Sequence, residues 1–123
     1  MKPGKSGISR IRDATDYSIQ GLKACWRNEA AFRQNFALAL VLFALSFLVA
    51  RSVEQWLLLN LPPAILLIVE LLNSAIENVV DLAGPERNEF AGRAKDMASA
   101  AVFLCLILIG TTWLAVCWSN YLA

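Results

Sequence analysis

Histidine is absent from the 123-residue sequence, and its three cysteines, Cys25, Cys105 and Cys117, form no Cys-x-x-Cys pair. A soft-metal site of the zinc type is therefore excluded, and we interpret the cysteines as small core residues. A Gly-x-x-x-x-Gly-Lys-Ser/Thr loop is also missing, which excludes nucleotide binding of the P-loop kind. Because there is no histidine, any general base that works near neutral pH must be a carboxylate.

Charged residues are missing from two long segments, 36–50 and 97–123, in a chain that is 58% hydrophobic. Such a composition is too apolar for a soluble domain of this size. We expect an all-α membrane protein with a single membrane domain over residues 1–123. Its predicted transmembrane helices cover 30–50, 56–80 and 97–120. Pro62 and Pro63 remove two backbone donors, so the second helix should be kinked or begin near them.

The N-terminal segment is polar but carries apolar residues at helical spacing, among them Ile8 and Ile11. We predict an amphipathic helix over 7–27 that lies in the membrane interface after a disordered tail at 1–6, with Gly21 as a candidate bend. A passive membrane anchor would show the same pattern. The segment lacks the aromatic interleaving of a nucleic-acid module, so we expect anionic lipid headgroups as its partner and no nucleic acid.

Basic residues are distributed asymmetrically, although the formal net charge is only +1. Seven precede the uncharged segment 36–50 and three lie between the second and third predicted spans, whereas the first connection contains only Arg51. The positive-inside rule then predicts a cytoplasmic N-terminus and second connection. The first connection and the C-terminus are predicted to lie outside.

Polar residues recur on one face of the second predicted span. From Glu70, the steps to Asn73, Ser74, Glu77 and Asp81 are i+3, i+4, i+7 and i+11, so these side chains share one side of a helix. A charge at the centre of a membrane helix costs roughly 2.5–3.5 kcal/mol on insertion scales, and such residues are usually functional. The alternative is that these carboxylates only join helices through hydrogen bonds.

With this topology, charged residues at the inner ends of the three spans lie at one level, including Lys95 and Asp96 at the start of the third. Glu70 and Glu77 are separated by roughly 10 Å along the helix axis, which places Glu70 deeper in the membrane. Glu29 is positioned to meet Glu77 across helices, in a pair of carboxylates suited to Mg²⁺. Glu70 is the best candidate for a general base on a lipid hydroxyl.

Several stretches closely resemble the bacterial integral-membrane diacylglycerol kinases, over about residues 7–119. They are Asn-Glu-Ala-Ala-Phe-Arg-Gln at 28–34, Ile-Val-Glu-Leu-Leu-Asn-Ser-Ala-Ile-Glu at 68–77 with Val-Val-Asp at 79–81, and Gly-Arg-Ala-Lys-Asp-Met at 92–97 with Ser-Ala-Ala at 99–101. The related undecaprenol kinases share the Glu-Asn-Ser-Glu stripe, but the 28–34 stretch looks like the diacylglycerol-specific branch. Two departures are Arg87-Asn88, where the family often has an aromatic residue and histidine, and the poorly matching segment 48–63.

The resemblance implies a homotrimer in the bacterial inner membrane, with active sites shared between subunits at the cytoplasmic interface. It implies transfer of the γ-phosphoryl group of ATP, bound with Mg²⁺, to diacylglycerol, giving phosphatidic acid for phospholipid recycling. Glu70 would be the general base, supported by Asn73, and Glu29 and Glu77 would hold the metal. Nucleotide contacts are implied for Arg10, Tyr17, Glu29, Glu77, Glu86, Arg87, Asn88, Lys95 and Asp96. Lipid-substrate contacts are implied for Arg10, Ala14, Tyr17, Ser18, Ala24, Trp26, Ala31, Phe32, Arg33, Gln34, Glu70 and Ser99.

Two other classes of function compete with a lipid kinase. Deep carboxylates are equally natural in a small proton or cation transporter, although three short spans without an internal repeat argue against one. A non-catalytic assembly subunit would not need Glu29, Glu70 and Glu77 together with Lys95 and Asp96 at one level.

Overall fold

The computed structural model describes residues 6–84 and 88–123, and these residues form helices and no strand. The elements are α1 (Gly7–Asn28), α2 (Ala30–Val49), α3 (Val53–Ala83), α4 (Glu89–Cys117) and a short π-helix (Trp118–Leu122). Three segments are long and apolar enough to cross a membrane, namely 30–49, 53–83 and 89–122. The chain is therefore an all-helical protein with three candidate membrane spans.

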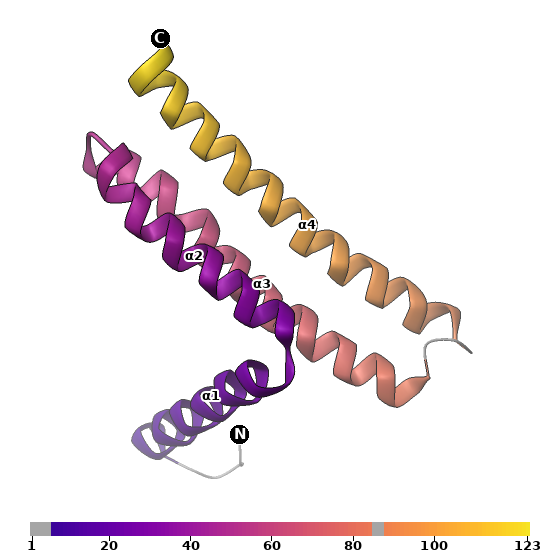
Figure 1. Cartoon of the computed structure of the whole chain (residues 1–123). Coiled ribbons are helices and arrows are strands. Elements are labelled where there is room, and N and C mark those ends of the chain that lie inside the picture. The colour runs from indigo at the N-terminus through magenta and orange to yellow at the C-terminus, as the bar shows by residue number, and fades with distance from the viewer. Residues whose placement is uncertain (1–5, 85–87) are drawn as a thin grey trace.

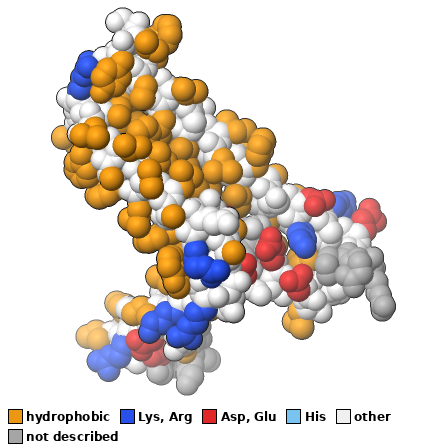
Figure 2. Space-filling model, in the orientation of Figure 1, with side chains coloured by type: hydrophobic (Ala, Val, Ile, Leu, Met, Phe, Trp, Pro, Cys, Tyr) orange, Lys and Arg blue, Asp and Glu red, His pale blue; other side chains and the backbone are white. Residues whose placement is uncertain are grey.

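Helix α3 lies between α2 and α4, and α1 turns away from this group at one end (Figure 1). In the most apolar stretch of each span, 39% of α3 is buried, against 11% of α2 and 17% of α4. The buried residues Leu66, Cys105 and Ile109 form the core between α3 and α4. Most other apolar side chains face outward, and Figure 2 shows them covering the spans while charged side chains gather around α1 and the end of the α3–α4 pair. This distribution suits a molecule surrounded by lipid.

Capping residues mark both ends of α3 and the start of α4, and both helices begin before the predicted spans. The Ser52 side chain accepts a hydrogen bond from the backbone N–H of Gln55 at 3.1 Å, and Gly84 ends α3 in the left-handed conformation with φ 77°. Asn88 Oδ1 accepts from the backbone N–H groups of the next turn, so α4 begins at Glu89. The absence of charge marks the apolar segment, whereas these caps mark the helix.

Helix α3 continues through Pro62 and Pro63 and does not begin at them. Pro63 has no N–H to donate to the carbonyl of Leu59, one helical turn earlier. The indole Nε1 of Trp113 on α4 donates to that carbonyl instead, at 3.1 Å. A neighbouring helix therefore satisfies a backbone group that the proline leaves unpaired.

Amide side chains join the helices toward the end that lies away from α1. Gln55 and Asn120 exchange two hydrogen bonds of 2.9 Å, and Asn120 Nδ2 also donates to the carbonyl of Val49 at 2.8 Å. Asn60 Nδ2 donates to Ser46 Oγ at 3.0 Å, which links α3 to α2. Because apolar packing between helices is weakly selective in lipid, such bonds fix how the spans are aligned.

The chain turns sharply between α1 and α2 at a single residue, Glu29, whose φ of −118° and ψ of 103° are extended. Helix α1 continues without interruption through Gly21, the candidate bend. Arg33 on α2 reaches back to α1, where its Nη1 donates to the carbonyls of Trp26 at 2.5 Å and Arg27 at 3.3 Å. These are carbonyls of the last turn of α1, which otherwise have no helical partner. We call this junction the elbow.

Candidate active site on the third helix

Glu70 lies on α3 with only 3% of its surface exposed, in the core of the three-helix group. Both carboxylate oxygens accept a hydrogen bond from an amide. Asn35 Nδ2 on α2 donates to Oε2 at 2.6 Å, and Asn73 Nδ2 on α3 donates to Oε1 at 3.2 Å. Donors of this kind replace the water that a buried carboxylate loses.

Asn73 connects Glu70 with the second carboxylate of the stripe, because its Nδ2 also donates to Glu77 Oε1 at 3.3 Å. The helical spacing of these residues makes the bridge possible, since i+3 and i+4 neighbours lie on the same face. Asn73 is itself buried, and its Oδ1 has no hydrogen-bond partner among residues 6–84 and 88–123. A buried acceptor without a partner calls for an explanation, and a bound donor or cation at this oxygen would supply one.

A polar pocket of about 480 Å³ opens between α1 and α3, beside this stripe. Glu29 lines it together with Ser74 and Asn78. Cys25 also faces it, and its Sγ lies 3.7 Å from Ser74 Oγ. Burial raises the pKa of the Cys25 thiol above its ordinary value of 9.0, and the nearby carboxylates Glu29 and Glu70 raise it further. Glu29 of the elbow and Glu70 of α3 thus both raise the pKa of the same thiol.

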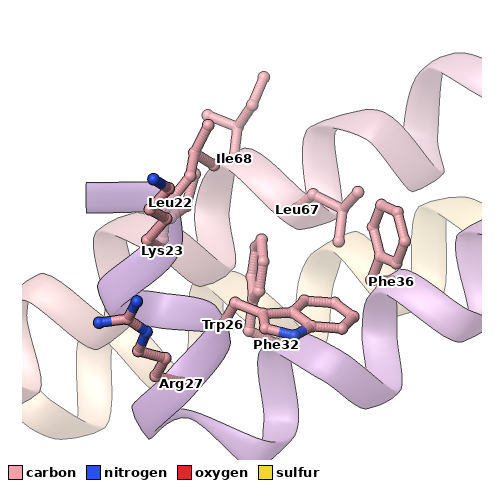
Figure 3. A pocket seen from close by; sticks show the side chains of 9 residues that line it. Leu22, Lys23, Trp26, Arg27, Phe32, Phe36, Leu67 and Ile68 are labelled. Atoms are coloured by element: carbon pink, nitrogen blue, oxygen red, sulfur yellow. The ribbon is translucent and has the colours of Figure 1, made fainter. Parts of the chain in front are cut away.

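A second, apolar pocket of about 500 Å³ lies where α1, α2 and α3 meet (Figure 3). The rings of Trp26, Phe32 and Phe36 form one wall, and Trp26 meets Phe36 edge-on with ring centroids 5.4 Å apart. Leu67 and Leu71, close neighbours of Glu70 in sequence, contribute to the lining from α3. A pocket of this character suits a hydrocarbon chain. Its remaining lining residues are Leu22, Lys23, Arg27 and Ile68.

The structure places the sequence-predicted residues in several groups. Ser18, Ala24 and Glu29 line the polar pocket, and Trp26 and Phe32 line the apolar one. The other predicted residues that the structure describes outside α3 are exposed or partly exposed, namely Arg10, Ala14, Tyr17, Ala31, Arg33, Gln34, Asn88, Lys95, Asp96 and Ser99. Two of them make the contacts described above: Arg33 bonds to the end of α1, and Asn88 caps α4.

Two of the predicted nucleotide contacts, Glu86 and Arg87, lie outside the described residues. Lys95, Asp96 and Ser99 are exposed on α4. Across 6–84 and 88–123, no hydrogen bond or ion pair joins any of these three to the stripe from Glu70 to Glu77. One chain therefore holds the buried Glu70 against α2 through Asn35, and presents these α4 polar residues outward.

The predicted metal ligands are oxygen donors, as Mg²⁺ prefers. Within the described part of the chain, no group of three or more Asp, Glu, Cys or His side chains is placed to hold a metal ion. The donor set of Glu29, Glu77 and the unpaired Asn73 Oδ1 fits a cation that takes one or two carboxylates and completes its shell with phosphate oxygens and water. The pairing of Glu29 with Glu77 stays a prediction.

Asn35 is the site residue that the sequence reasoning missed. It stands between Gln34 and Phe36, at the point where the polar entry of the first span becomes apolar, and so reads as part of that entry. A signal was nevertheless present, because a polar amide within an apolar helix usually has a partner on a neighbouring helix.

These features define a class: a small membrane protein of three apolar helices with a buried carboxylate that accepts hydrogen bonds from two amides. Residues next to this carboxylate on α3 line two pockets, one with polar lining residues and one apolar. A sequence profile described as Prokaryotic diacylglycerol kinase matches residues 16–117. The chain belongs to this family. The match covers the elbow, α2, α3 and all of α4, and so includes the site described above.

Individual relatives agree with this assignment along nearly the whole chain. The chain is 43% identical to the Diacylglycerol kinase of Escherichia coli (strain K12) over 122 residues, which are 98% of this chain and 99% of that protein. It is 46% identical to the Diacylglycerol kinase of Pseudomonas aeruginosa (strain PAO1) over 89% of each chain. It is 42% identical to that of Haemophilus influenzae (strain Rd), over 88% of this chain and 92% of that protein.

Proposed function

We propose that this protein is a lipid kinase that transfers the γ-phosphoryl group of ATP to the free hydroxyl of diacylglycerol, giving phosphatidic acid. Membership of the family supports the reaction class. The observation that carries the assignment to particular residues is Glu70, a buried carboxylate with an amide donor on each oxygen, close in the helix to an apolar pocket. That combination suits a base that works on the headgroup of a lipid whose chains stay in an apolar environment.

In this proposal, Glu70 accepts the proton of the lipid hydroxyl as the hydroxyl oxygen attacks the γ-phosphorus. The bond from the γ-phosphorus to the β,γ-bridging oxygen breaks, and ADP leaves. The carboxylate is held by amide donors and lies away from bulk water, so it is already oriented before the substrate arrives. Trp26 and Phe32 would hold an acyl chain in the apolar pocket, which keeps the hydroxyl near the level of Glu70.

Mg²⁺, as Mg-ATP, would be held by Glu29 and Glu77, with Asn73 Oδ1 as a further oxygen donor. When bound, the cation neutralises charge on the β- and γ-phosphate oxygens. Asn73 would keep the two α3 carboxylates at a fixed separation, since its amide bonds to both. The cationic side chains at this end of the molecule, Arg10 and Lys95 among them, are proposed to bind nucleotide phosphates.

The proposed setting is a homotrimer in the bacterial inner membrane, with the N-terminus and the site on the cytoplasmic side and the C-terminus outside. The outward-facing apolar side chains of α2 and α4 leave surface for lipid and for further copies. A trimer would allow Lys95, Asp96 and Ser99, which are exposed on α4, to meet the carboxylates of a second subunit. Helix α1 would rest in the interface beside anionic headgroups.

The decisive test compares Glu70→Gln with the wild type and with Glu54→Gln, a matched control on the exposed first turn of α3. ATP-dependent phosphorylation of diacylglycerol and of undecaprenol would be measured side by side in mixed micelles with Mg²⁺. We expect Glu70→Gln to lower turnover by about 10²–10⁴-fold, the range for general-base assistance, without loss of folding or Mg-ATP binding. Glu54→Gln should match the wild type. Activity of Glu70→Gln within a few fold of wild type would remove Glu70 from the mechanism, and a preference for undecaprenol would correct the substrate.

A further inference from the structure

Asn35 reaches Glu70 from a neighbouring helix, and its Nδ2 donates to Glu70 Oε2 at 2.6 Å. We infer that Asn35 is a positioning residue for phosphoryl transfer, which aims the Glu70 carboxylate at the lipid hydroxyl without touching the substrate itself. The inference rests on the proposed function, because it takes Glu70 as the base. It adds a polar residue from α2, which otherwise contributes aromatic side chains to the apolar pocket.

The two amides that hold Glu70 make unequal bonds. The Asn35 bond to Glu70 Oε2 is short, at 2.6 Å. The Asn73 bond to Glu70 Oε1 is longer, at 3.2 Å, and the same Nδ2 also donates to Glu77 Oε1 at 3.3 Å. Hydrogen bonds weaken as they lengthen, so Asn35 provides the firmer restraint. Oε2 is thereby fixed, and Oε1 is the oxygen more available to take a proton.

Asn35 restrains Glu70 effectively because the two residues lie on different helices. A partner on α3 itself, such as Asn73, moves with Glu70 when the helix shifts. Asn35 lies on α2 and therefore ties the carboxylate to a second rigid element, one that starts at the elbow where Glu29 lies. A reacting group must be held within a fraction of an ångström for efficient transfer, and this is better achieved from two helices than from one.

A purely structural role for Asn35 is the alternative, since amides also join helices in membranes. A matched example lies toward the end of the α2–α3 pair that is away from α1. Asn60 on α3 donates to Ser46 Oγ on α2 at 3.0 Å, and so joins the same two helices without a carboxylate. Removing either amide should weaken the α2–α3 contact, but only the loss of Asn35 should alter the chemistry.

The experiment measures kcat and KM for Mg-ATP and for diacylglycerol in Asn35→Leu, Asn35→Gln and the control Asn60→Leu, per mole of assembled protein. We expect Asn35→Leu to lower kcat by about 10- to 100-fold, the usual effect of removing a donor to a charged group, with both KM values within about twofold of wild type. Asn35→Gln keeps a donor and should recover part of that loss. Asn60→Leu should lower thermal stability by a similar amount to Asn35→Leu and leave kcat unchanged.

Combination with Glu70→Gln separates this inference from the proposed function. If Asn35 acts through Glu70, adding Asn35→Leu to Glu70→Gln should cause no further loss. Full activity of Glu70→Gln would overturn the proposed base, and this inference with it. An inactive Glu70→Gln together with an Asn35→Leu kcat equal to that of Asn60→Leu would overturn the positioning role alone. A raised KM for diacylglycerol at unchanged kcat would also overturn it, because that result indicates direct substrate contact. Should Asn35→Leu not assemble, Asn35→Ser, whose hydroxyl is too short to reach Oε2, gives the same comparison.

Discussion

The hydrogen bond from Trp113 Nε1 to the Leu59 carbonyl should stabilise the fold only because Pro63 is present. Trp113→Phe removes the indole N–H and keeps an aromatic ring against α3. Leu59 is fully buried, at 0% exposure, and water cannot readily replace the lost donor. Pro63 has no N–H, so the helix cannot supply one either.

The size of the effect follows from this lack of alternatives. Interhelical hydrogen bonds in membrane proteins average about 0.6 kcal/mol and reach about 1.7, and an unpaired buried acceptor costs about 1–3 kcal/mol. We therefore expect Trp113→Phe to lower the free energy of unfolding by about 1–2 kcal/mol. With Pro63→Ala, the restored backbone N–H at position 63 can bond to Leu59, and the penalty of Trp113→Phe should fall below about 0.5 kcal/mol.

The wild type, Trp113→Phe, Pro63→Ala and the double variant would be unfolded by increasing SDS in mixed micelles. Unfolding would be followed by far-UV circular dichroism, which does not depend on the tryptophan removed. Loss of packing volume from Trp113→Phe occurs in both backgrounds and cancels in the comparison. An equal penalty with and without Pro63 would refute the reasoning, because the indole bond would then not be compensating for the proline.

Three further outcomes are expected. Glu29→Gln and Glu77→Gln should each raise the Mg²⁺ concentration needed for half-maximal activity, and the double variant should be little worse than either; multiplicative losses would indicate separate roles. Deleting residues 1–6 should leave kinase activity intact, whereas deleting 1–20 should abolish it in protein that still inserts and assembles; normal rates in the longer truncation would make α1 only an anchor. Because the pKa of Cys25 is raised, its alkylation should require a higher pH than an ordinary thiol, which mass spectrometry across a pH series would detect.

The helical class and the three apolar spans were predictable from the sequence, because the absence of charge over long segments is a strong signal in a small chain. The first and last residues of the helices were not predictable from the sequence. Helix α4 begins at Glu89, eight residues before the predicted span at 97, since the cap at Asn88 sets the helix start. The turn at Glu29 carries neither glycine nor proline, and it depends on Arg33 bonding back to α1, which is a tertiary contact.

The stripe from Glu70 to Glu77 was predictable because helical spacing alone places these side chains together, and the structure adds the Asn73 bridge between them. Partners from other helices were harder to foresee. The contact of Asn35 with Glu70 depends on how α2 is rotated against α3, and apolar helices with little amphipathic character leave that rotation open. Pairing of Glu29 with Glu77 and the contributions of α4 remain predictions.

The elbow at Glu29 limits insertions and deletions in the connection between α1 and α2. Connecting segments usually accept insertions and deletions easily, because they have slack. Here a single residue separates two long helices, and Arg33 fastens their ends together. One residue inserted into the first turn of α2 would turn the following residues by about 100° about the helix axis and move Asn35 off the side that faces Glu70. The connection between α1 and α2 should therefore be as constant in length as the interior of a helix.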